Sequence, residues 1–449
     1  MPEPQRRPDW KRLIDGRAAA LVCMLLLTLA TATAAQTPDA EVQDAGAGDT
    51  HGRDWLPSKP FTFWNGRIAI SGDASLTVGP RDDGYFNMLE YYHDAFSVLR
   101  LGLSASVRVT DRISVLGQVV DDIALRGDPF VDVDRHVVRV YALFLRVQPW
   151  TSHPFDVQAG RVPPVFGAFG RSSYGSDNPL IGVPLAYQYQ TTLREDAVPA
   201  NAASLLAIRG RGWSFHYPQG VGAEYFAAGM PIVESQQWDT GVEAHWGTDS
   251  SPIDASVAIT KGTLSAPQME DNNNGKQVAG RVAFRPATGL VAGVSLAAGE
   301  YLSHDVVNLL PSTLQHESYT QRAVGVDGEY SRGYWLVRGE SILSAWRVPA
   351  MDPRLDESLK AWSSFVEAKW RFAPRWYLAG RADHLGFSQI EDPATRARVN
   401  WDAPVTRLET GIGYTIRRNV RAKVAYQYNW RDARVRREGL LGAQLVYWF

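Results

Sequence analysis

The chain has 449 residues, a formal net charge of −2 at pH 7 and one cysteine, Cys23. A charge so close to zero offers no polyelectrolyte surface and argues against nucleic acid as a partner, and a single cysteine excludes a disulfide framework. After the first 35 residues no apolar run approaches the length of a membrane-spanning helix. The chain is nevertheless rich in aromatic residues, with 15 tryptophans, 18 tyrosines and 16 phenylalanines.

Residues 1–35 have the pattern of a secretory signal peptide. Basic residues precede the apolar run AAALVCMLLLTLA at 18–30, and small residues follow at Thr33 and Ala35. We expect cleavage after Ala35. The alternative is a membrane anchor, but the run is shorter than the roughly 17–25 residues that a spanning helix needs.

Residues 36–60 are acidic and rich in glycine and proline, a composition typical of disordered chain. We predict a disordered periplasmic segment there and a single domain over 61–449.

From residue 61 onward apolar and polar side chains alternate, which is the period of a β-strand. The alternation is clearest in GRIAISGDASLTVG (66–79), LRLGLSASVRVT (99–110) and RAKVAYQYNWR (421–431). Each stretch has one continuous apolar face and is about ten residues long or longer, the length of a tilted membrane strand. The pattern predicts an all-β fold, a transmembrane antiparallel β-barrel.

Short and long connections alternate between the predicted strands. The short ones, expected as hairpin turns, are 110–112, 149–154, 247–252, 285–289, 331–333, 373–375 and 417–419. The long ones are 80–96, 162–201, 263–276, 303–319, 347–359 and 389–403. In outer-membrane barrels short turns face the periplasm and long loops face outside. We count about 18 strands with 16 as the alternative, since the strands read at 202–216, 221–230 and 238–248 are the least clear.

The chain ends in GAQLVYWF (442–449), with Leu445, Tyr447 and Phe449 on one apolar face. These residues resemble the C-terminal assembly signal of bacterial outer-membrane proteins. The resemblance implies the outer membrane of a Gram-negative-type bacterium, contact with its lipid, and the barrel-assembly machinery as a partner. The alternative is a secreted soluble β-sandwich or solenoid, which would expose these apolar rows to water.

The opposite face of the strands carries many charged side chains. A barrel of 16–18 strands leaves an aqueous channel, and water removes the large cost of burying such charges. Candidate lumen residues are Arg100, Arg108, Arg139, Arg381, Arg421, Lys423, Asp383 and Glu409, with Glu340, Glu367 and Arg407 on the same face. The basic excess of the inward face favours anions, whereas pairing of the charges across strands would leave little net field.

The longest predicted connection, 162–201, is too apolar for a free surface loop, and long loops in compact folds are usually functional. We predict that it folds into the barrel as a constriction. The stretch GRVPPVFG (160–167) resembles the start of the constricting loop in general and phosphate-selective porins.

The candidate constriction residues are Arg161, Arg171 and Arg194, since rings of fixed charge set selectivity in pores. The loop lacks the lysine cluster of phosphate porins, so phosphate selectivity is not supported. The alternative is a loop that covers an outer face or mediates subunit contact.

Residues for catalysis or metal binding are not apparent. The histidines have no close metal-ligand spacing, and DNNNG at 271–275 lacks most ligands of a calcium loop and is typical of a turn. We therefore expect no enzyme activity, metal or cofactor.

The sequence favours an outer-membrane porin for passive diffusion of small hydrophilic solutes, and the resemblance to porins implies a homotrimer. The alternative is a closed barrel that acts as a surface scaffold or adhesin, or that transports a specific apolar solute.

Overall fold

The computed structural model describes residues 57–87, 97–125, 136–150, 152–172, 175–235, 238–248, 251–273, 275–355, 358–431 and 438–449. The signal peptide predicted at 1–35 and most of the segment predicted at 36–60 lie outside these residues. Within the described part of the chain, no helix is long and apolar enough to cross a membrane.

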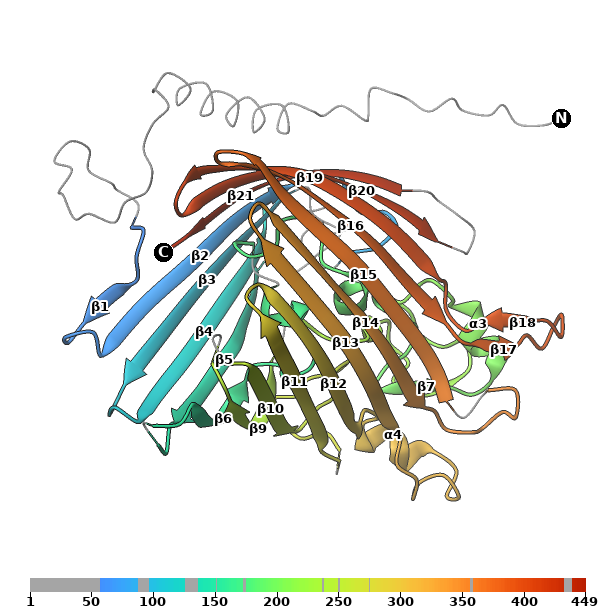
Figure 1. The fold of residues 1–449 in the computed structure, drawn as a ribbon. Coiled ribbons are helices and arrows are strands. Elements are labelled where there is room, and N and C mark those ends of the chain that lie inside the picture. The colour runs from blue at the N-terminus through green and yellow to red at the C-terminus, as the bar shows by residue number, and fades with distance from the viewer. Residues whose placement is uncertain are drawn as a thin grey trace, which may run out of the picture.

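Sixteen antiparallel strands in the described residues close into a barrel in which consecutive strands pair and the last pairs with the first (Figure 1). They are β2 (Ile68–Val78), β3 (Ser97–Arg108), β4 (Ile113–Ala124), β5 (His136–Val147), β6 (Phe155–Val162), β9 (Asp239–Trp246), β10 (Ile253–Thr260), β11 (Gln277–Ala287), β12 (Leu290–Glu300), β13 (Thr320–Arg332), β14 (Trp335–Arg347), β15 (Ser358–Ala373), β16 (Trp376–Phe387), β19 (Val405–Arg417), β20 (Val420–Arg431) and β21 (Glu438–Trp448). The predicted transmembrane barrel fold is confirmed, with the alternative count of 16 strands rather than the preferred 18.

The barrel closes where β21 pairs with the second half of β2, from Asp73 opposite Trp448 to Val78 opposite Ala443. Phe449 extends this pairing, because its backbone N–H donates to the Gly72 carbonyl at 2.9 Å. The short strand β1 (Phe61–Phe63) pairs with the first residues of β2, on the edge that β21 leaves uncovered. Its Phe61 ring meets the Phe449 ring edge-on at 5.4 Å between centroids.

The surplus of two strands in the prediction came from the segment before β9. Residues read as strands at 202–216 and 221–230 instead form α3 (Ala202–Ala207) and the short β8 (Gly220–Gly222), which pairs with β7 (Ala197–Pro199). The Asn201 side chain accepts a hydrogen bond from the Ser204 N–H and caps α3, so a helix begins where alternation predicted a strand. Consequently β6 and β9 are joined by one connection over 163–238, which is longer than the predicted 162–201.

The predicted division into short turns and long loops is confirmed. The short turns gather at one end of the barrel and the long connections at the other (Figure 1). Gly289 and Gly333 occupy two of the turns with φ of +80° and +60°, values that only glycine adopts at no steric cost. The long connections carry the remaining elements, η2 (Phe169–Ser172), α2 (Leu185–Gln188), α4 (His304–Leu309), β17 (Gln389–Glu391) and β18 (Arg398–Asn400).

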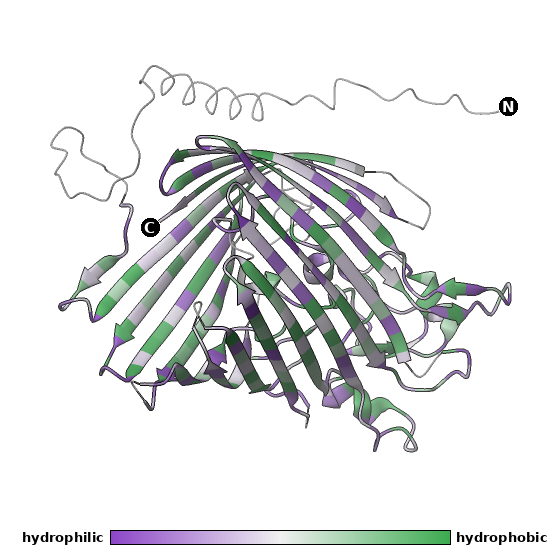
Figure 2. Cartoon of the chain, in the orientation of Figure 1, coloured by the Kyte–Doolittle hydropathy of each residue, from purple (hydrophilic) through white to green (hydrophobic). Residues whose placement is uncertain are grey.

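Hydrophobic and hydrophilic residues alternate along the strands (Figure 2), which places them on opposite faces of the sheet. In β15, Trp362, Val366 and Trp370 are 46%, 59% and 39% exposed, whereas Phe365 and Glu367 between them are 6% and 1% exposed. At the end of the barrel with the short turns, outward aromatic rings pair across strands, as in Trp335 with Trp370 and Trp376 with Tyr414. Such girdles are typical of membrane interfaces.

A bulge in β5 interrupts the alternation close to the candidate lumen residue Arg139. The β4–β5 register shifts between Gln118 and Val119, so that Tyr141 has no partner in β4 and both Tyr141 and Ala142 are buried. Arg139 still faces inward, two residues before the bulge, because it pairs with Asp122 (2.7 Å) from the inner face of β4.

The C-terminal strand has the predicted faces. Leu441 is 59% exposed on the outside, whereas Leu440 and Val446 are 2% and 1% exposed on the inside. Leu445, Tyr447 and Phe449 share the outward parity of Leu441 and are partly buried beside β1 and β2.

The assignment of faces predicts that arginine is tolerated at Ser104 but not at the neighbouring Leu103. Leu103 is 56% exposed on the outer face, where arginine at the bilayer midplane costs about 2–4 kcal/mol. We expect Leu103→Arg to lower the free energy of unfolding in lipid vesicles by about this amount, and Ser104→Arg to lower it by less than about 1 kcal/mol. Equal losses in the two variants would contradict the assignment.

Candidate functional site

The connection 163–238, here called the inner segment, folds into the barrel and lies against the strands from β12 to β20 (Figure 1). Its apolar side chains form the main buried cluster together with the inner faces of the strands. Members from the inner segment include Phe166, Leu185 and Tyr187, and members from the surrounding elements include Trp346, Phe365 and Trp401. The predicted in-folded loop is therefore present, and it is longer than expected.

The first attachment of the inner segment is the buried carboxylate of Glu340 on β14. It accepts hydrogen bonds from the Ala168 N–H (3.0 Å) and the Tyr187 hydroxyl (2.6 Å). Gly167 has φ of +76°, and a Cβ there would lie 2.5 Å from Glu340 Oε1. Glycine is therefore required for the close approach of this turn to the strand.

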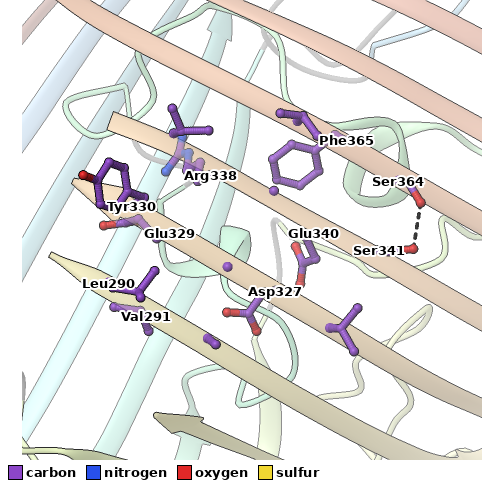
Figure 3. Close-up of a pocket in the computed structure, with 16 residues that line it drawn as sticks. Leu290, Val291, Asp327, Glu329, Tyr330, Arg338, Glu340, Ser341, Ser364 and Phe365 are labelled. Atoms are coloured by element: carbon purple, nitrogen blue, oxygen red, sulfur yellow. Dashed lines mark hydrogen bonds between the residues drawn. The ribbon is translucent and has the colours of Figure 1, made fainter. Parts of the chain in front are cut away.

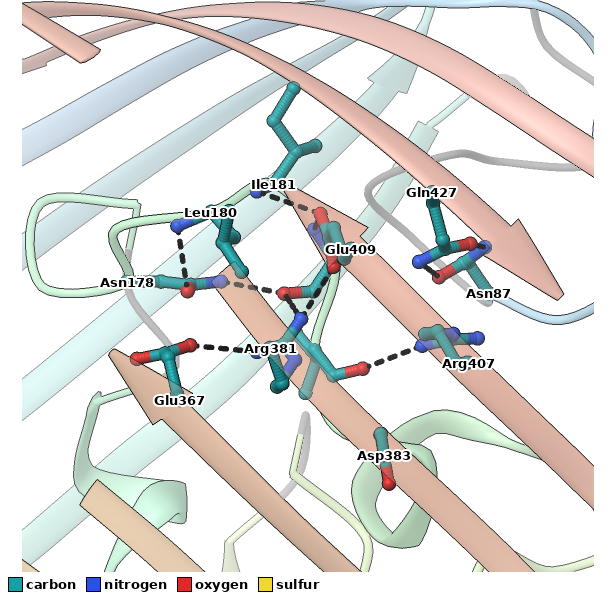
Figure 4. Close-up of polar contacts among 12 residues, drawn as sticks. Asn87, Asn178, Leu180, Ile181, Glu367, Arg381, Asp383, Arg407, Glu409 and Gln427 are labelled. Carbon is teal, nitrogen blue, oxygen red and sulfur yellow. Dashed lines mark hydrogen bonds and ion pairs between the residues drawn. The ribbon is translucent and has the colours of Figure 1, made fainter. Parts of the chain in front are cut away.

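The second attachment lies at β16 and β19, where two inward carboxylates accept backbone N–H groups. Figure 4 shows the contacts of one of them, Glu409. Glu409 Oε1 accepts from Ile181 (3.2 Å) and Gly182 (2.8 Å), and Asp383 Oδ2 accepts from Leu185 (2.6 Å). Charge-assisted hydrogen bonds of this kind are stronger than neutral ones, so they hold the segment firmly to the strands.

Basic side chains satisfy the carbonyl groups of the same stretch. Lys423 Nζ donates to three carbonyls at 3.0 Å, those of Gly175, Asn178 and Leu180. Arg407 donates to the carbonyls of Val183 (2.9 Å) and Phe86 (2.8 Å), so it also ties down the loop after β2. Backbone polar groups of irregular chain must find partners when buried, and the inner face of the barrel supplies them.

Arg381 is at the centre of this attachment. Its side chain is 0% exposed and lies between Glu409 (2.6 Å) and Glu367 (3.1 Å), while it also donates to the Gly182 carbonyl (2.5 Å). Arg338 binds the other oxygen of Glu367 at 2.6 Å. Such alternation of charges compensates the cost of removing each from water.

The strands that face the inner segment carry ion pairs of their own. Asp122 on β4 pairs with Arg139 (2.7 Å) and Arg100 (3.5 Å), and His245 on β9 lies between the carboxylates of Asp156 and Asp254. Between these strands and the inner segment lies a cavity of about 270 Å³, lined by Arg146, Gln158, Pro163, Pro164, Gly170, Trp238, Glu243 and His245.

Among the predicted constriction arginines, the two whose side chains are described, Arg161 and Arg194, lie in different surroundings. Arg194 is buried within the inner segment, where Asp196 binds its guanidinium through two contacts of 2.7 Å and the carbonyls of Phe215 and Tyr225 accept at 2.9 Å. Arg161 is 6% exposed at the end of β6. Arg171 lies in η2, and its side chain is outside the described residues. Their part in selectivity stays a prediction.

Of the predicted lumen residues, Arg381, Asp383, Glu409 and Lys423 gather at the inner segment. Arg421 lies at the edge of this group, with its Nη1 2.6 Å from the Ser176 carbonyl. Arg100 and Arg139 lie together on the facing strands. Arg108 is exposed at the end of β3 with the short turns, away from both groups.

Two buried aspartates in loops were missed by the sequence analysis. Asp402 accepts the N–H groups of Thr192 and Gly210, each at 2.8 Å, and Asp82 accepts those of Phe86 and Asn87. Burial raises the pKa of both carboxyl groups, and these hydrogen bonds oppose the rise. No period identifies an inward position in a loop, so the sequence carries no signal for them.

A shallow depression of about 590 Å³ crosses β12 to β15, where small residues such as Gly328 and Gly339 leave room (Figure 3). Its lining is mostly apolar. Ser341 and Ser364 lie on the outer face there and share a hydrogen bond of 2.7 Å, in which one hydroxyl donates and the other accepts.

The fold is that of the outer-membrane β-barrels of Gram-negative bacteria. The chain is similar to Salmonella typhi OmpF, solved in complex with daunomycin, with 10% identity over 87% of this chain and 100% of that chain and a TM-score of 0.51. It is similar to a loop L8 deletion mutant of OmpT, an outer membrane protein of Vibrio cholerae, with 13% identity over 85% and 99% of the two chains and a TM-score of 0.50.

The in-vitro folded trimer form of Vibrio cholerae OmpT has a TM-score of 0.49 at 13% identity, over 85% of this chain and 99% of that chain. No protein-family model matches the chain. No curated protein matches its sequence.

Removal of Arg381 should destabilise the barrel strongly. Arg381→Gln leaves the buried Glu409 without the guanidinium that lies 2.6 Å away, and breaking a buried pair in this way costs about 3–5 kcal/mol. We expect a loss of this size in the free energy of unfolding, measured by tryptophan fluorescence in guanidinium chloride with lipid vesicles. In the control Arg139→Gln, Asp122 keeps Arg100, so a smaller loss than in Arg381→Gln is expected. An equal loss would contradict the central position of Arg381.

Glu195 predicts a pH dependence of stability. Burial raises the pKa of this loop carboxyl to about 7 from 4.5, while hydrogen bonds from Asn272 and Gln268 oppose the rise. Between these values only the unfolded state ionises, so the free energy of unfolding falls as pH rises through this window and is level above it. We expect Glu195→Gln to abolish this decrease in the free energy of unfolding. At pH 8 the variant should be more stable than the wild type by roughly 2 kcal/mol.

The measurement is chemical unfolding at pH 4 and pH 8. Glu224→Gln, at an exposed position of the same connection, is the matched control and should keep the fall of the wild type. A wild type whose stability does not decline over this range would refute the role of Glu195.

Proposed function

We propose that the protein is an outer-membrane channel that allows passive diffusion of small hydrophilic solutes. The observation that carries the proposal is the attachment of the inner segment to the strands from β12 to β20, opposite strands that keep charged side chains on their inner face. Arg100, Arg139 and Asp122 on those strands are 4–19% exposed at their side chains, and charges in such a position favour an aqueous surrounding over dry packing.

The lumen charge supports at most a modest general preference for anions. Most inward charges are paired, as in Arg281 with Asp327 and Arg338 with Glu367, both at 2.6 Å. Paired charges produce little net electric field in the lumen. The ion preference would therefore come from the inward charges that have no partner of opposite sign. Arg161, Arg171 and Arg194 remain candidates for a constriction by analogy with charged rings in other pores.

Location in the outer membrane of a Gram-negative-type bacterium, contact with its lipid and insertion by the barrel-assembly machinery form part of the same proposal. The apolar outer face, the aromatic pairs at the turn end and the aromatic C-terminus support them. A homotrimer is proposed by analogy with porins.

The second candidate is a closed barrel that serves as a surface scaffold or adhesin, or that carries a specific apolar solute. The observation in its favour is the large apolar cluster that the inner segment forms with Trp346, Phe365, Phe387 and Trp401 in the half of the barrel nearer the long loops. A cluster packed in this way excludes water from part of the lumen.

Single-channel conductance of the refolded chain in a planar bilayer separates the two candidates. An open channel gives stable conductance steps, because water and ions pass beside the inner segment, and a salt gradient then reports the ion preference through the reversal potential. A folded, heat-resistant barrel without conductance would reject the diffusion channel in favour of the closed barrel.

Two variants provide the matched comparison for this experiment. Arg139→Gln removes a positive charge from the lumen and should move the reversal potential toward cation preference. Arg322→Gln removes an equal charge from an exposed outer-face position on β13 and should leave it unchanged. A shift of the same size in both would mean that lumen charge does not set the preference.

A further inference from the structure

A second pocket opens at the end of the lumen with the short turns. Its volume is about 440 Å³, and it is lined by β13 to β16 with β19 and β20. The lining residues that matter here are basic and aromatic: Lys369, Arg371, Arg375, Arg421, Tyr334 and Tyr377. We call it the turn-end pocket.

The turn-end pocket has four basic side chains and no acidic one among its lining residues. The charged groups that act most strongly on Lys369 are Arg421, Arg371 and Arg338, together with the carboxylate of Glu367. Both oxygens of Glu367 are already bound, one by Arg338 and the other by Arg381. The positive charge of the pocket is therefore uncompensated by the described residues.

Aromatic rings, rather than carboxylates, hold these cations in place. Lys369 Nζ lies 4.7 Å from the centre of the Tyr377 ring, and the Arg371 guanidinium lies 5.9 Å from that of Tyr334. Arg421 lies over the rings of Tyr377 (5.8 Å) and Trp448 (5.3 Å). The face of an aromatic ring attracts a cation but is not a conventional hydrogen-bond acceptor. Most N–H groups of Lys369, Arg371 and Arg421 therefore remain available to donate hydrogen bonds to a ligand.

The hydrogen bonds of Arg421 among the described residues support the availability of its N–H groups. Arg421 Nε is buried without a partner, and only its Nη1 is bound, to the Ser176 carbonyl at 2.6 Å. Elsewhere in the lumen basic groups meet carboxylates at short range, as Arg281 meets Asp327 and Arg139 meets Asp122. The turn-end pocket thus differs in charge from these parts of the inner face.

We propose that the turn-end pocket binds a small multivalent oxyanion, of phosphate or polycarboxylate chemistry. Guanidinium groups match the oxygens of such anions geometrically and an ammonium adds a point charge. The volume exceeds that of a single phosphate and accommodates an anion with two or three oxyanion groups. Solutes that enter or leave through the turn end of the barrel would meet this site first or last.

The test is isothermal titration calorimetry of the full mature chain, refolded in detergent, with inorganic pyrophosphate as the probe. We expect saturable binding at one site. The variant K369Q/R371Q removes two of the four charges and should weaken binding by about tenfold or more. The variant R67Q/R112Q removes two exposed charges at the same end of the barrel but outside the pocket, and should bind as the wild type does.

If the double variant does not refold, the single variant Arg375→Gln replaces it. Arg375 lies in an exposed turn, so this substitution should leave the fold intact and weaken pyrophosphate binding to a smaller extent. Absence of binding by the wild type, or equal weakening in R67Q/R112Q and K369Q/R371Q, would overturn the proposal. Binding in detergent does not require an open channel. Lack of conductance with intact binding therefore counts against the channel alone, and conductance without binding counts against the pocket alone.

Discussion

The structure depends on the requirement that backbone N–H and C=O groups within a membrane find partners inside the protein. Closure of the sheet meets this requirement for the strands. β21 covers the second half of β2 and β1 covers the first, so the seam between the two ends of the chain is complete. Phe449 completes the pairing with Gly72 and packs against Phe61.

The same requirement applies within the lumen, where the inner segment has little regular structure of its own. Its N–H groups bind Glu340, Asp383 and Glu409, and its carbonyls bind Arg381 and Lys423. Many inward charges are therefore hydrogen-bond partners for buried backbone rather than free fixed charge. At the turn-end pocket, by contrast, the described lining residues include four basic side chains and no acidic one.

The inner segment also explains why a channel and a closed barrel are both reasonable functions. Its apolar cluster favours closure near the long loops, whereas its attachment to one side leaves charged strands on the other. A barrel wide enough for an aqueous channel can hold such a segment and still conduct, provided that the facing side remains hydrated. Whether the barrel conducts depends on the width of the space between the inner segment and the facing strands, and not on the number of strands.

The sequence by itself determined the strands, the order of turns and loops, and which face of each strand is apolar, because a period of two is a local property. It failed over 202–230, since alternation looks the same in a membrane strand and in chain packed inside a barrel. It placed Arg381 and Glu409 on the inner face but could not identify their partners. Only the tertiary structure decided these, because Gly182 and Glu409 are 227 residues apart and meet when the inner segment folds into the barrel.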